Sequence, residues 1–263
     1  MTKSSIKKLY YPLILVNHKL RLIAKEFIDQ KPTIETPKDG VAAYMMSKAY
    51  KTHGVILNLA RNGYAQDADM LARTLFDTHL IIASVVDDET DKTAMQYLHF
   101  DDETKSDMFS QLDREGKFKE YFEQRKLNPK EGDEPIEKIQ ERAQNWLEEY
   151  GKDFKRQWYG DKKTSEMAKL AEVGHYHSTA YKLQSQLIHS LPRTMDFYLA
   201  DVDGKLVMTP DPDERYVDIP LSASFNMFFL IVEKYAKHFK IDADAMFEPL
   251  VTEYGEAVKS TSD

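Results

Sequence analysis

Residues 65–86 read AQDADMLARTLFDTHLIIASVV, and the pattern of this stretch decides the fold class. Apolar residues recur at steps of three and four, for example from Ala68 to Ala72 and on to Leu75, which is the period of an α-helix. Phe76 adds an apolar side chain at another angle around the same helix. A helix that is apolar nearly all round is typical of a central, buried position. The stretch therefore predicts the inner helix of an all-α protein.

Helical periodicity extends over most of the remaining chain. We expect an all-α, multi-helix bundle of about eight helices that forms a single domain over residues 1–263. Residues 196–208 interrupt the helical pattern, because Asp203-Gly204 between two short apolar runs is typical of a β-hairpin turn. Two more helices are predicted within residues 221–258.

The composition is ordinary for a soluble globular protein, with 42% apolar and 30% charged residues. The 36 basic and 44 acidic residues give a formal charge of −8. A surface that binds polyanions in general needs clustered lysine and arginine side chains. The charge balance therefore weakens the case for nucleic acid as a partner, although a small basic patch around one site stays compatible with it.

Cysteine is absent, which excludes disulfides, zinc fingers, iron–sulfur clusters and thiol nucleophiles and fits a reducing compartment. The apolar run at residues 10–16 is followed by polar residues without a small-residue cleavage site, so we expect no signal peptide. The longest strongly apolar run, residues 225–232, is shorter than the ~20 residues that span a bilayer. We therefore expect a cytoplasmic protein without a membrane partner.

Arg73 and Asp77 lie four residues apart within the predicted inner helix. Buried charges need partners, because an unpaired charge is costly to remove from water. One alternative is a pair along the helix, but an acid that precedes a base is the favoured order at this spacing. The other is that Asp77 orients His189 or Tyr181, which leaves Arg73 to bind an anion through its planar guanidinium.

A second polar pattern, Tyr181-x-x-x-Ser185-x-x-x-His189, ends shortly before Pro192. Four-residue steps put the three side chains near one helix face, over ~12 Å of helix. His189 falls in the last turn, where the helix dipole favours a protonated imidazole, so it is a candidate general acid or base. The alternative is a buried polar network that only fixes how the helices pack.

Four features together resemble a known family: Arg73-x-x-x-Asp77, Tyr97, the Trp158-Tyr159-Gly160 loop and Tyr181-x-x-x-Ser185-x-x-x-His189. The pattern is similar to that of a bacterial all-helical family catalogued as a domain of unknown function, over residues 41–191. That family has glutamate where Asp77 stands here. The resemblance carries no activity. It implies that Arg73, Asp77, Tyr181, Ser185 and His189 share one pocket, and it makes Trp158 a candidate ligand contact.

A weaker resemblance is to the HEPN superfamily of helical nucleotide-binding proteins and metal-independent ribonucleases. Its nuclease motif is arginine followed after four to six residues by histidine, and Arg73 and His79 have that spacing. Thr74 stands where the motif has Asn, Asp or His, and six residues turn a helix through ~240°, which separates the two side chains. The resemblance implies RNA cleavage with the 2′-hydroxyl as nucleophile, in a toxin or phage-defence setting.

No metal or other cofactor is predicted. Glu172-x-x-His175 has the spacing of a di-iron ligand pair, but a di-iron bundle needs a second such pair and none occurs. We expect a homodimer, the commonest assembly, with residues 225–230 as core or dimer face. Three functions stay open: binding of a small anionic or nucleotide-like ligand, a HEPN-like ribonuclease, and a non-catalytic interaction module. The candidate catalytic residues are Arg73, His189 and Tyr181, and the candidate ligand-binding residues are Asp77, Ser185, His79 and Trp158.

Overall fold

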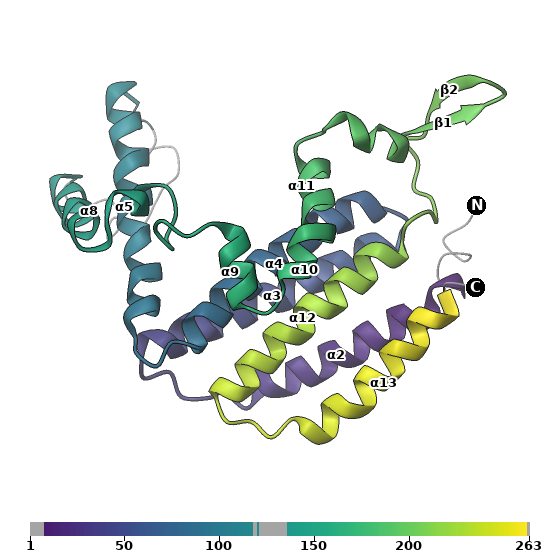
Figure 1. Cartoon of the computed structure of the whole chain (residues 1–263), viewed down its shortest axis with the longest axis horizontal. Coiled ribbons are helices and arrows are strands. Elements are labelled where there is room, and N and C mark those ends of the chain that lie inside the picture. Colours follow the sequence, from purple (N-terminus) through teal and green to yellow (C-terminus); the bar gives the residue numbers. More distant parts are fainter. Residues whose placement is uncertain (1–7, 118–119, 121–135, 262–263) are drawn as a thin grey trace. The chain divides into compact units, whose positions relative to one another are not determined.

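The computed structural model describes residues 8–117, 120 and 136–261, and these are overwhelmingly helical. Ten α-helices and one two-stranded hairpin lie in this part of the chain, which confirms the all-α prediction (Figure 1). The chain forms two compact units: residues 1–87 with 165–263, and residues 88–164. That both belong to one domain stays a prediction.

The first unit is a helical bundle. Its elements are α2 (Tyr11–Asp29), α3 (Pro37–Arg61), α4 (Ala65–Val86), α9 (Thr164–Leu170), α10 (Gly174–Tyr176), the π-helical turn η2 (His177–Tyr181), α11 (Lys182–Ile188), the 3-10 turn η3 (Pro192–Phe197), α12 (Asp218–His238) and α13 (Asp244–Thr261). Helix α4 packs against α3, α12 and α11, while α13 packs along α2 (Figure 1). Helix α4 is therefore the inner helix of this unit, as its apolar pattern predicts.

The core of the first unit follows from the sequence pattern. Leu75, Phe76 and Ile82 of α4 have no exposed surface, and neither has Phe228 of α12. The apolar run at residues 225–230 belongs largely to this core, because Phe225, Met227 and Phe228 are buried. That run is therefore core rather than a face for a second copy, and the homodimer stays a prediction.

The β-hairpin confirms the prediction for residues 196–208. Strand β1 (Leu199–Val202) pairs antiparallel with β2 (Lys205–Met208). Asp203 and Gly204 both have positive φ, at 55° and 76°, as a two-residue type I′ turn requires. The side chains of β2 are all exposed, so the hairpin adds nothing to the core.

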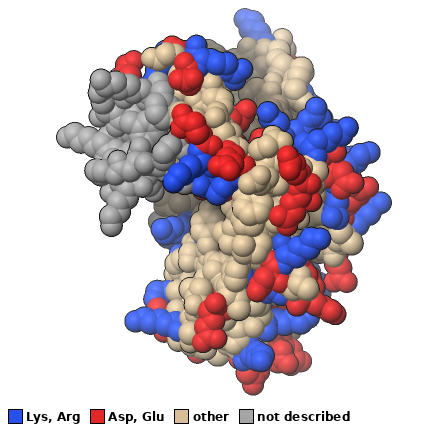
Figure 2. Space-filling model, turned by 90° about the vertical axis from the view of Figure 1, so that its left-hand side faces the viewer, with Lys and Arg blue, Asp and Glu red and all other residues tan. Residues whose placement is uncertain are grey.

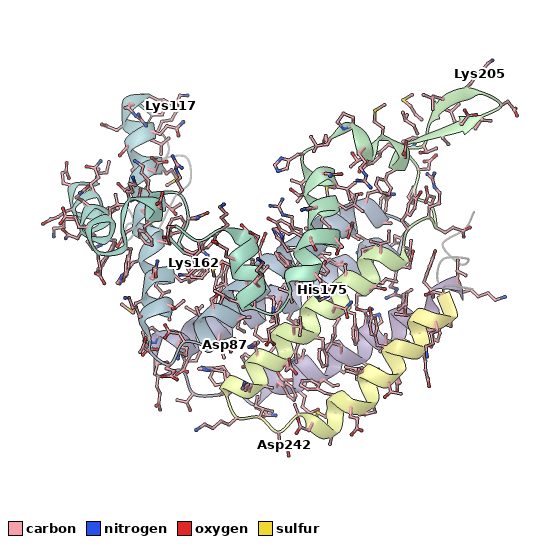
Figure 3. The ribbon with its side chains drawn as sticks, viewed as in Figure 1. Asp87, Lys117, Lys162, His175, Lys205 and Asp242 are labelled. Atoms are coloured by element: carbon pink, nitrogen blue, oxygen red, sulfur yellow. The ribbon has the colours of Figure 1, made fainter. Side chains whose placement is uncertain are left out.

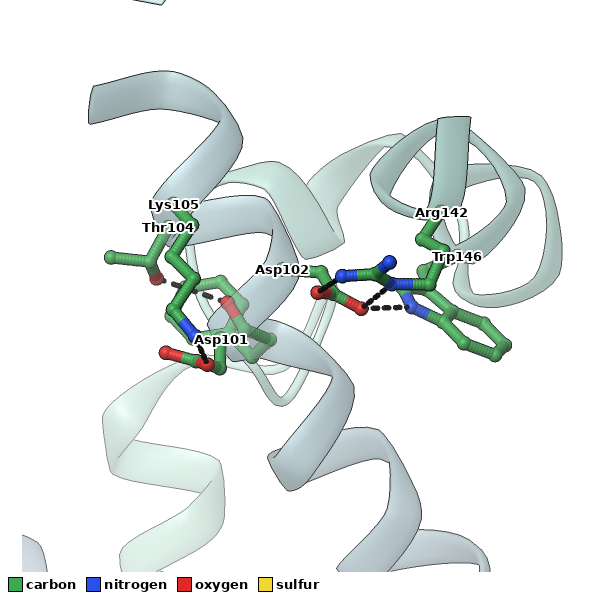
Figure 4. A network of polar contacts seen from close by, with 7 residues as sticks. Asp101, Asp102, Thr104, Lys105, Arg142 and Trp146 are labelled. Atoms are coloured by element: carbon green, nitrogen blue, oxygen red, sulfur yellow. Dashed lines mark hydrogen bonds and ion pairs between the residues drawn. The ribbon is translucent and has the colours of Figure 1, made fainter. Parts of the chain in front are cut away.

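The second unit consists of α5 (Lys92–Arg114), α8 (Ile136–Tyr150) and the 3-10 turn η1 (Lys152–Lys155). Its polar contacts centre on Asp102, which accepts hydrogen bonds from Arg142 at 2.7 and 3.0 Å and from the indole N–H of Trp146 at 3.0 Å (Figure 4). The imidazole of His99 stacks on Trp146 with ring centres 3.6 Å apart. These contacts hold α5 and α8 together.

The polar, helical pattern of residues 91–126 predicts one helix, and residues 128–135 are typical of a connection. Helix α5 ends at Arg114 and residues 115–116 form a turn, so the predicted helix is interrupted there. Residues 118–119 and 121–135 lie outside the described residues. No helix in the described part of the chain is both long enough and apolar enough to cross a membrane. On the face that Figure 2 shows, acidic and basic side chains intermix, and among the described residues there no extended basic patch forms.

Candidate functional site

The candidate site lies where α4 faces the segment from α10 to α11. Arg73 of α4 meets Tyr181, while Asp69, one turn earlier on α4, meets Gln184 of α11. A lower residue number on α4 therefore pairs with a higher number on its partner. The two segments run antiparallel, and this register decides which of the predicted residues come together.

Arg73 binds Tyr181 in two ways. Its Nη2 donates a hydrogen bond to the Tyr181 hydroxyl at 3.0 Å, and the guanidinium carbon lies 4.8 Å from the centre of the Tyr181 ring. The Nε of Arg73 is buried and has no hydrogen-bond partner, and Arg73 forms no ion pair with any described carboxylate. A guanidinium has five N–H donors, so this one keeps unused donor capacity in a half-buried position.

Aromatic rings surround this contact. Phe76 is fully buried and packs against Tyr181 with ring centres 4.7 Å apart and against Tyr176 at 5.4 Å. The imidazole of His177 stacks on Tyr181 at 4.9 Å. We call Arg73, Phe76, His177 and Tyr181 the arginine–aromatic cluster.

The π-helical turn η2 makes this cluster possible. Tyr176 and Tyr181 are five residues apart, and in a regular α-helix they would point ~140° away from each other. A π-turn bonds residue i to i+5, which brings residues five apart to the same side of the helix. Both rings therefore reach Phe76. π-turns inside α-helices are frequent at functional sites, and the sequence analysis did not predict this one.

Asp77 follows Arg73 by one turn on α4 and is half-buried. Burial raises the pKa of its carboxyl, while the charges of Arg73 and Lys48 act in the opposite direction. Its carboxylate makes no hydrogen bond with a described residue, so it does not orient Tyr181 or His189 in this way. Neither of the two pairings predicted for Asp77 is present as a direct contact.

A second polar network lies one turn earlier and was missed by sequence reasoning. Gln184 donates hydrogen bonds from its amide to Asp69 at 2.8 Å and to the Tyr176 hydroxyl at 3.0 Å, and all three side chains are buried. Burial raises the pKa of Asp69 to about 6 and also raises the pKa of Tyr176. We call these three residues the buried amide network. Asp69 lies four residues before Arg73, so the spacing puts the two side chains near one face of the helix, but it does not show that Gln184 lies opposite Asp69.

His189 differs most from the prediction. It follows the last residue of α11 and its side chain is exposed, whereas the sequence analysis placed it in a buried pocket with Arg73. The antiparallel register explains the difference: Tyr181 lies beside Arg73, so His189, eight residues further on, is displaced by ~12 Å along the helix axis. Ser185 lies between them on α11, half-buried, and its hydroxyl makes no hydrogen bond with a described residue.

His79 lies further along α4 and is 1% exposed. Its Nε2 is 3.4 Å from the carbonyl oxygen of Ala171, and its Nδ1 is buried without a partner. Burial lowers the pKa of His79 to about 4, so the ring is neutral at pH 7. His79 is therefore almost completely buried and contacts Ala171, whereas Arg73 contacts Tyr181, so the two residues of the HEPN-like spacing do not meet.

Trp158 belongs to the second unit, where it packs edge-on against Tyr97 and Tyr159 and is 8% exposed. Its position in a loop is as predicted, because residues 157–163 contain turns and no helix. Its role as a ligand contact stays a prediction.

Comparison with known proteins gives one match. A family model described as a family of unknown function, DUF5677, matches residues 39–206, which is well over half of the chain. No curated protein and no solved structure matches. The match confirms the resemblance to a helical family of unknown function, and it gives the HEPN resemblance no support.

Proposed function

The chain belongs to the DUF5677 family, whose function is unknown, and we propose that it binds a small anionic ligand through Arg73 and Tyr181. One observation carries this proposal: the half-buried guanidinium of Arg73 has a buried Nε without a hydrogen-bond partner, and it makes no ion pair with a carboxylate among the described residues. A buried donor that stays unpaired costs free energy. An anion bound at the guanidinium would satisfy it.

The direction of the hydrogen bond between these residues adds a second donor. Arg73 donates and the Tyr181 oxygen accepts, so the phenolic hydrogen of Tyr181 is free to point elsewhere. Guanidinium and phenol donors together suit an acceptor with several oxygens, such as a phosphate. The carboxylate of Asp77, one turn further along α4, works against a bound anion when it is ionised, so the donors of Arg73 and Tyr181 have to outweigh it.

Aromatic rings favour a nucleotide-like ligand over a bare anion. The half-buried imidazole of His177 lies on the Tyr181 ring, next to the guanidinium. Flat rings beside a phosphate-binding group can stack a base, because every nucleobase has a π-face. We therefore expect a nucleoside monophosphate to bind more tightly than inorganic phosphate.

The alternative of a HEPN-like ribonuclease has less support. His79, the histidine of its motif, contacts Ala171, whereas Arg73 contacts Tyr181, so the two side chains of the motif are not brought together. A general acid or base must reach the proton that it transfers. The non-catalytic interaction module predicts that substitution of Arg73 lowers stability and that no small ligand binds.

The test is calorimetric titration with AMP and with inorganic phosphate, on the wild type and on Arg73→Gln. Arg21→Gln is the matched control, because the Arg21 guanidinium lies 3.9 Å from the centre of the Tyr50 ring and donates to the Tyr50 carbonyl. AMP should bind the wild type and Arg21→Gln with equal affinity, and Arg73→Gln should lose at least about tenfold. A wild type that binds neither compound, or an equal loss in both variants, would contradict the proposal.

A further inference from the structure

A cavity of about 580 Å³ lies in the first unit, away from the arginine–aromatic cluster, none of whose residues lines it. Its walls come from the C-terminal part of α12, the connection to α13, the start of α13 and residues 171–173. Leu230, Ile241 and Phe247 supply apolar surface to it. The volume is within the range of small-molecule sites.

One buried polar side chain in the wall of this cavity lacks a partner. His79 lines the cavity, is 1% exposed and has a buried Nδ1 that makes no hydrogen bond. Since the Ala171 carbonyl can only accept, the Nε2 of the neutral ring carries the hydrogen, and Nδ1 is left as an acceptor. The Nδ1 of His79 therefore lacks a hydrogen-bond donor.

The charges at the cavity are predominantly negative. Four exposed carboxylates line it: Glu172, Glu233, Asp242 and Asp244. Of the two lysines, Lys234 is already bound by both carboxylate oxygens of Asp87, at 2.6 and 2.7 Å, and only Lys237 is left to oppose the acids. Figure 3 shows Asp242 in the connection between α12 and α13 and Asp87 at the end of α4.

No group of three or more His, Asp or Glu side chains among the described residues is placed to hold a metal ion, which favours an organic cation over a metal.

We propose that this cavity binds an organic cation of the polyamine class. Ammonium groups of the ligand pair with the carboxylates at the rim, its methylene segments lie on the apolar wall, and one N–H group donates to Nδ1 of His79. The proposal is independent of anion binding at Arg73, because the two sites share no residue and take ligands of opposite charge.

The test is calorimetric titration with spermidine at low ionic strength. The double substitution Glu233→Gln with Asp242→Asn should weaken binding by about tenfold or more, since it removes two of the four carboxylates. Glu248→Gln is the matched control, because Glu248 is exposed on α13 and does not line the cavity. Unchanged binding in the control supports the proposal. An equal loss in the control, or no binding to the wild type, overturns it.

A second measurement locates the ligand without any substitution. In nitrogen-15 NMR spectra of the histidine rings, spermidine should shift the Nδ1 resonance of His79, because a hydrogen-bond donor then reaches its lone pair. Spermidine that binds without moving this resonance sits elsewhere, and that outcome also overturns the proposal. Arg73→Gln should bind spermidine as the wild type does, so failure of this site and failure of the anion site are distinguishable.

Discussion

Asp69 and Arg73 lie one turn apart on α4 and face the same partner segment, but their surroundings differ. Asp69 belongs to the buried amide network, in which Gln184 donates to both the carboxylate and Tyr176. Arg73 has one hydrogen bond to Tyr181, a buried Nε without a partner and no ion pair within the described chain. The polar groups of the buried amide network bond to one another, whereas Arg73 in the arginine–aromatic cluster keeps N–H donors without an acceptor.

This difference in hydrogen bonding suggests a structural role for Asp69 and a binding role for Arg73. A network whose groups satisfy one another fixes how the helices pack. A group that keeps unused donors at the edge of the core has hydrogen-bonding capacity for a bound ligand. Substitutions in the first network should therefore change stability, and substitutions in the second should mainly change ligand binding.

The largest expected effect is a loss of stability when the buried amide network is disrupted. Gln184→Leu removes the donor to Asp69 and leaves a buried carboxylate alone, which should lower the free energy of unfolding by about 3 kcal/mol. Gln186→Leu is the matched control two residues away, because the side-chain oxygen of Gln186 is buried without a partner and its removal should be neutral or stabilising. Urea unfolding measures both. An equal decrease in the free energy of unfolding of both variants would contradict a special structural role for the buried amide network.

A smaller effect concerns the pH dependence of the same network. The pKa of Asp69 is raised to about 6 in the folded protein, from an ordinary value of 3.8. Between these values the folded state holds a proton that the unfolded state has released, so stability falls as the pH rises, by about 2 kcal/mol from pH 4 to pH 6.

The variant Asp69→Asn should remove this contribution, because an amide does not titrate and still offers an acceptor to Gln184. Its unfolding free energy, measured at pH 4, 5 and 6, should decline less than that of the wild type. Parallel pH profiles for the two proteins would show that Asp69 titrates normally in the folded state.

A substitution in the arginine–aromatic cluster should change ligand binding more than stability. Tyr181→Phe keeps the ring beside Arg73 and removes only the hydroxyl, so the free energy of unfolding should fall by about 1 kcal/mol or less. Binding of AMP should weaken by about fivefold, because one of two proposed donors is lost. A decrease in stability as large as that of Gln184→Leu, with AMP affinity unchanged, would mean that Tyr181 has a structural role and does not bind the ligand.

How far the sequence predicts this site can be argued from the same residues. The apolar pattern of residues 65–86 predicted the inner helix. The four-residue spacings singled out Arg73 and Tyr181, and these two side chains are in contact, while their role in a site stays a prediction. Spacing along one helix does not give the register between two helices. The pairing of Asp69 with Gln184 depends on that register, so no pattern within either helix predicted it.

The π-helical turn at His177–Tyr181 is a second case. Its five residues, HSTAY, have no distinctive local pattern. The turn is instead accompanied by a tertiary contact, because it lets both Tyr176 and Tyr181 reach the buried Phe76. Because this conformation accompanies packing against another helix, the sequence of the turn alone does not predict it.

The smallest expected effect is at His189, where the same register argument applies. The imidazole is exposed at the end of α11 and outside both networks. His189→Ala should therefore change the free energy of unfolding by less than about 0.5 kcal/mol, as exposed substitutions usually do. It should also leave AMP binding unaltered, whereas Arg73→Gln should weaken it by at least about tenfold. Loss of AMP binding in His189→Ala would mean that the two side chains meet in the bound state, and the antiparallel register would then have to shift by about two turns of helix.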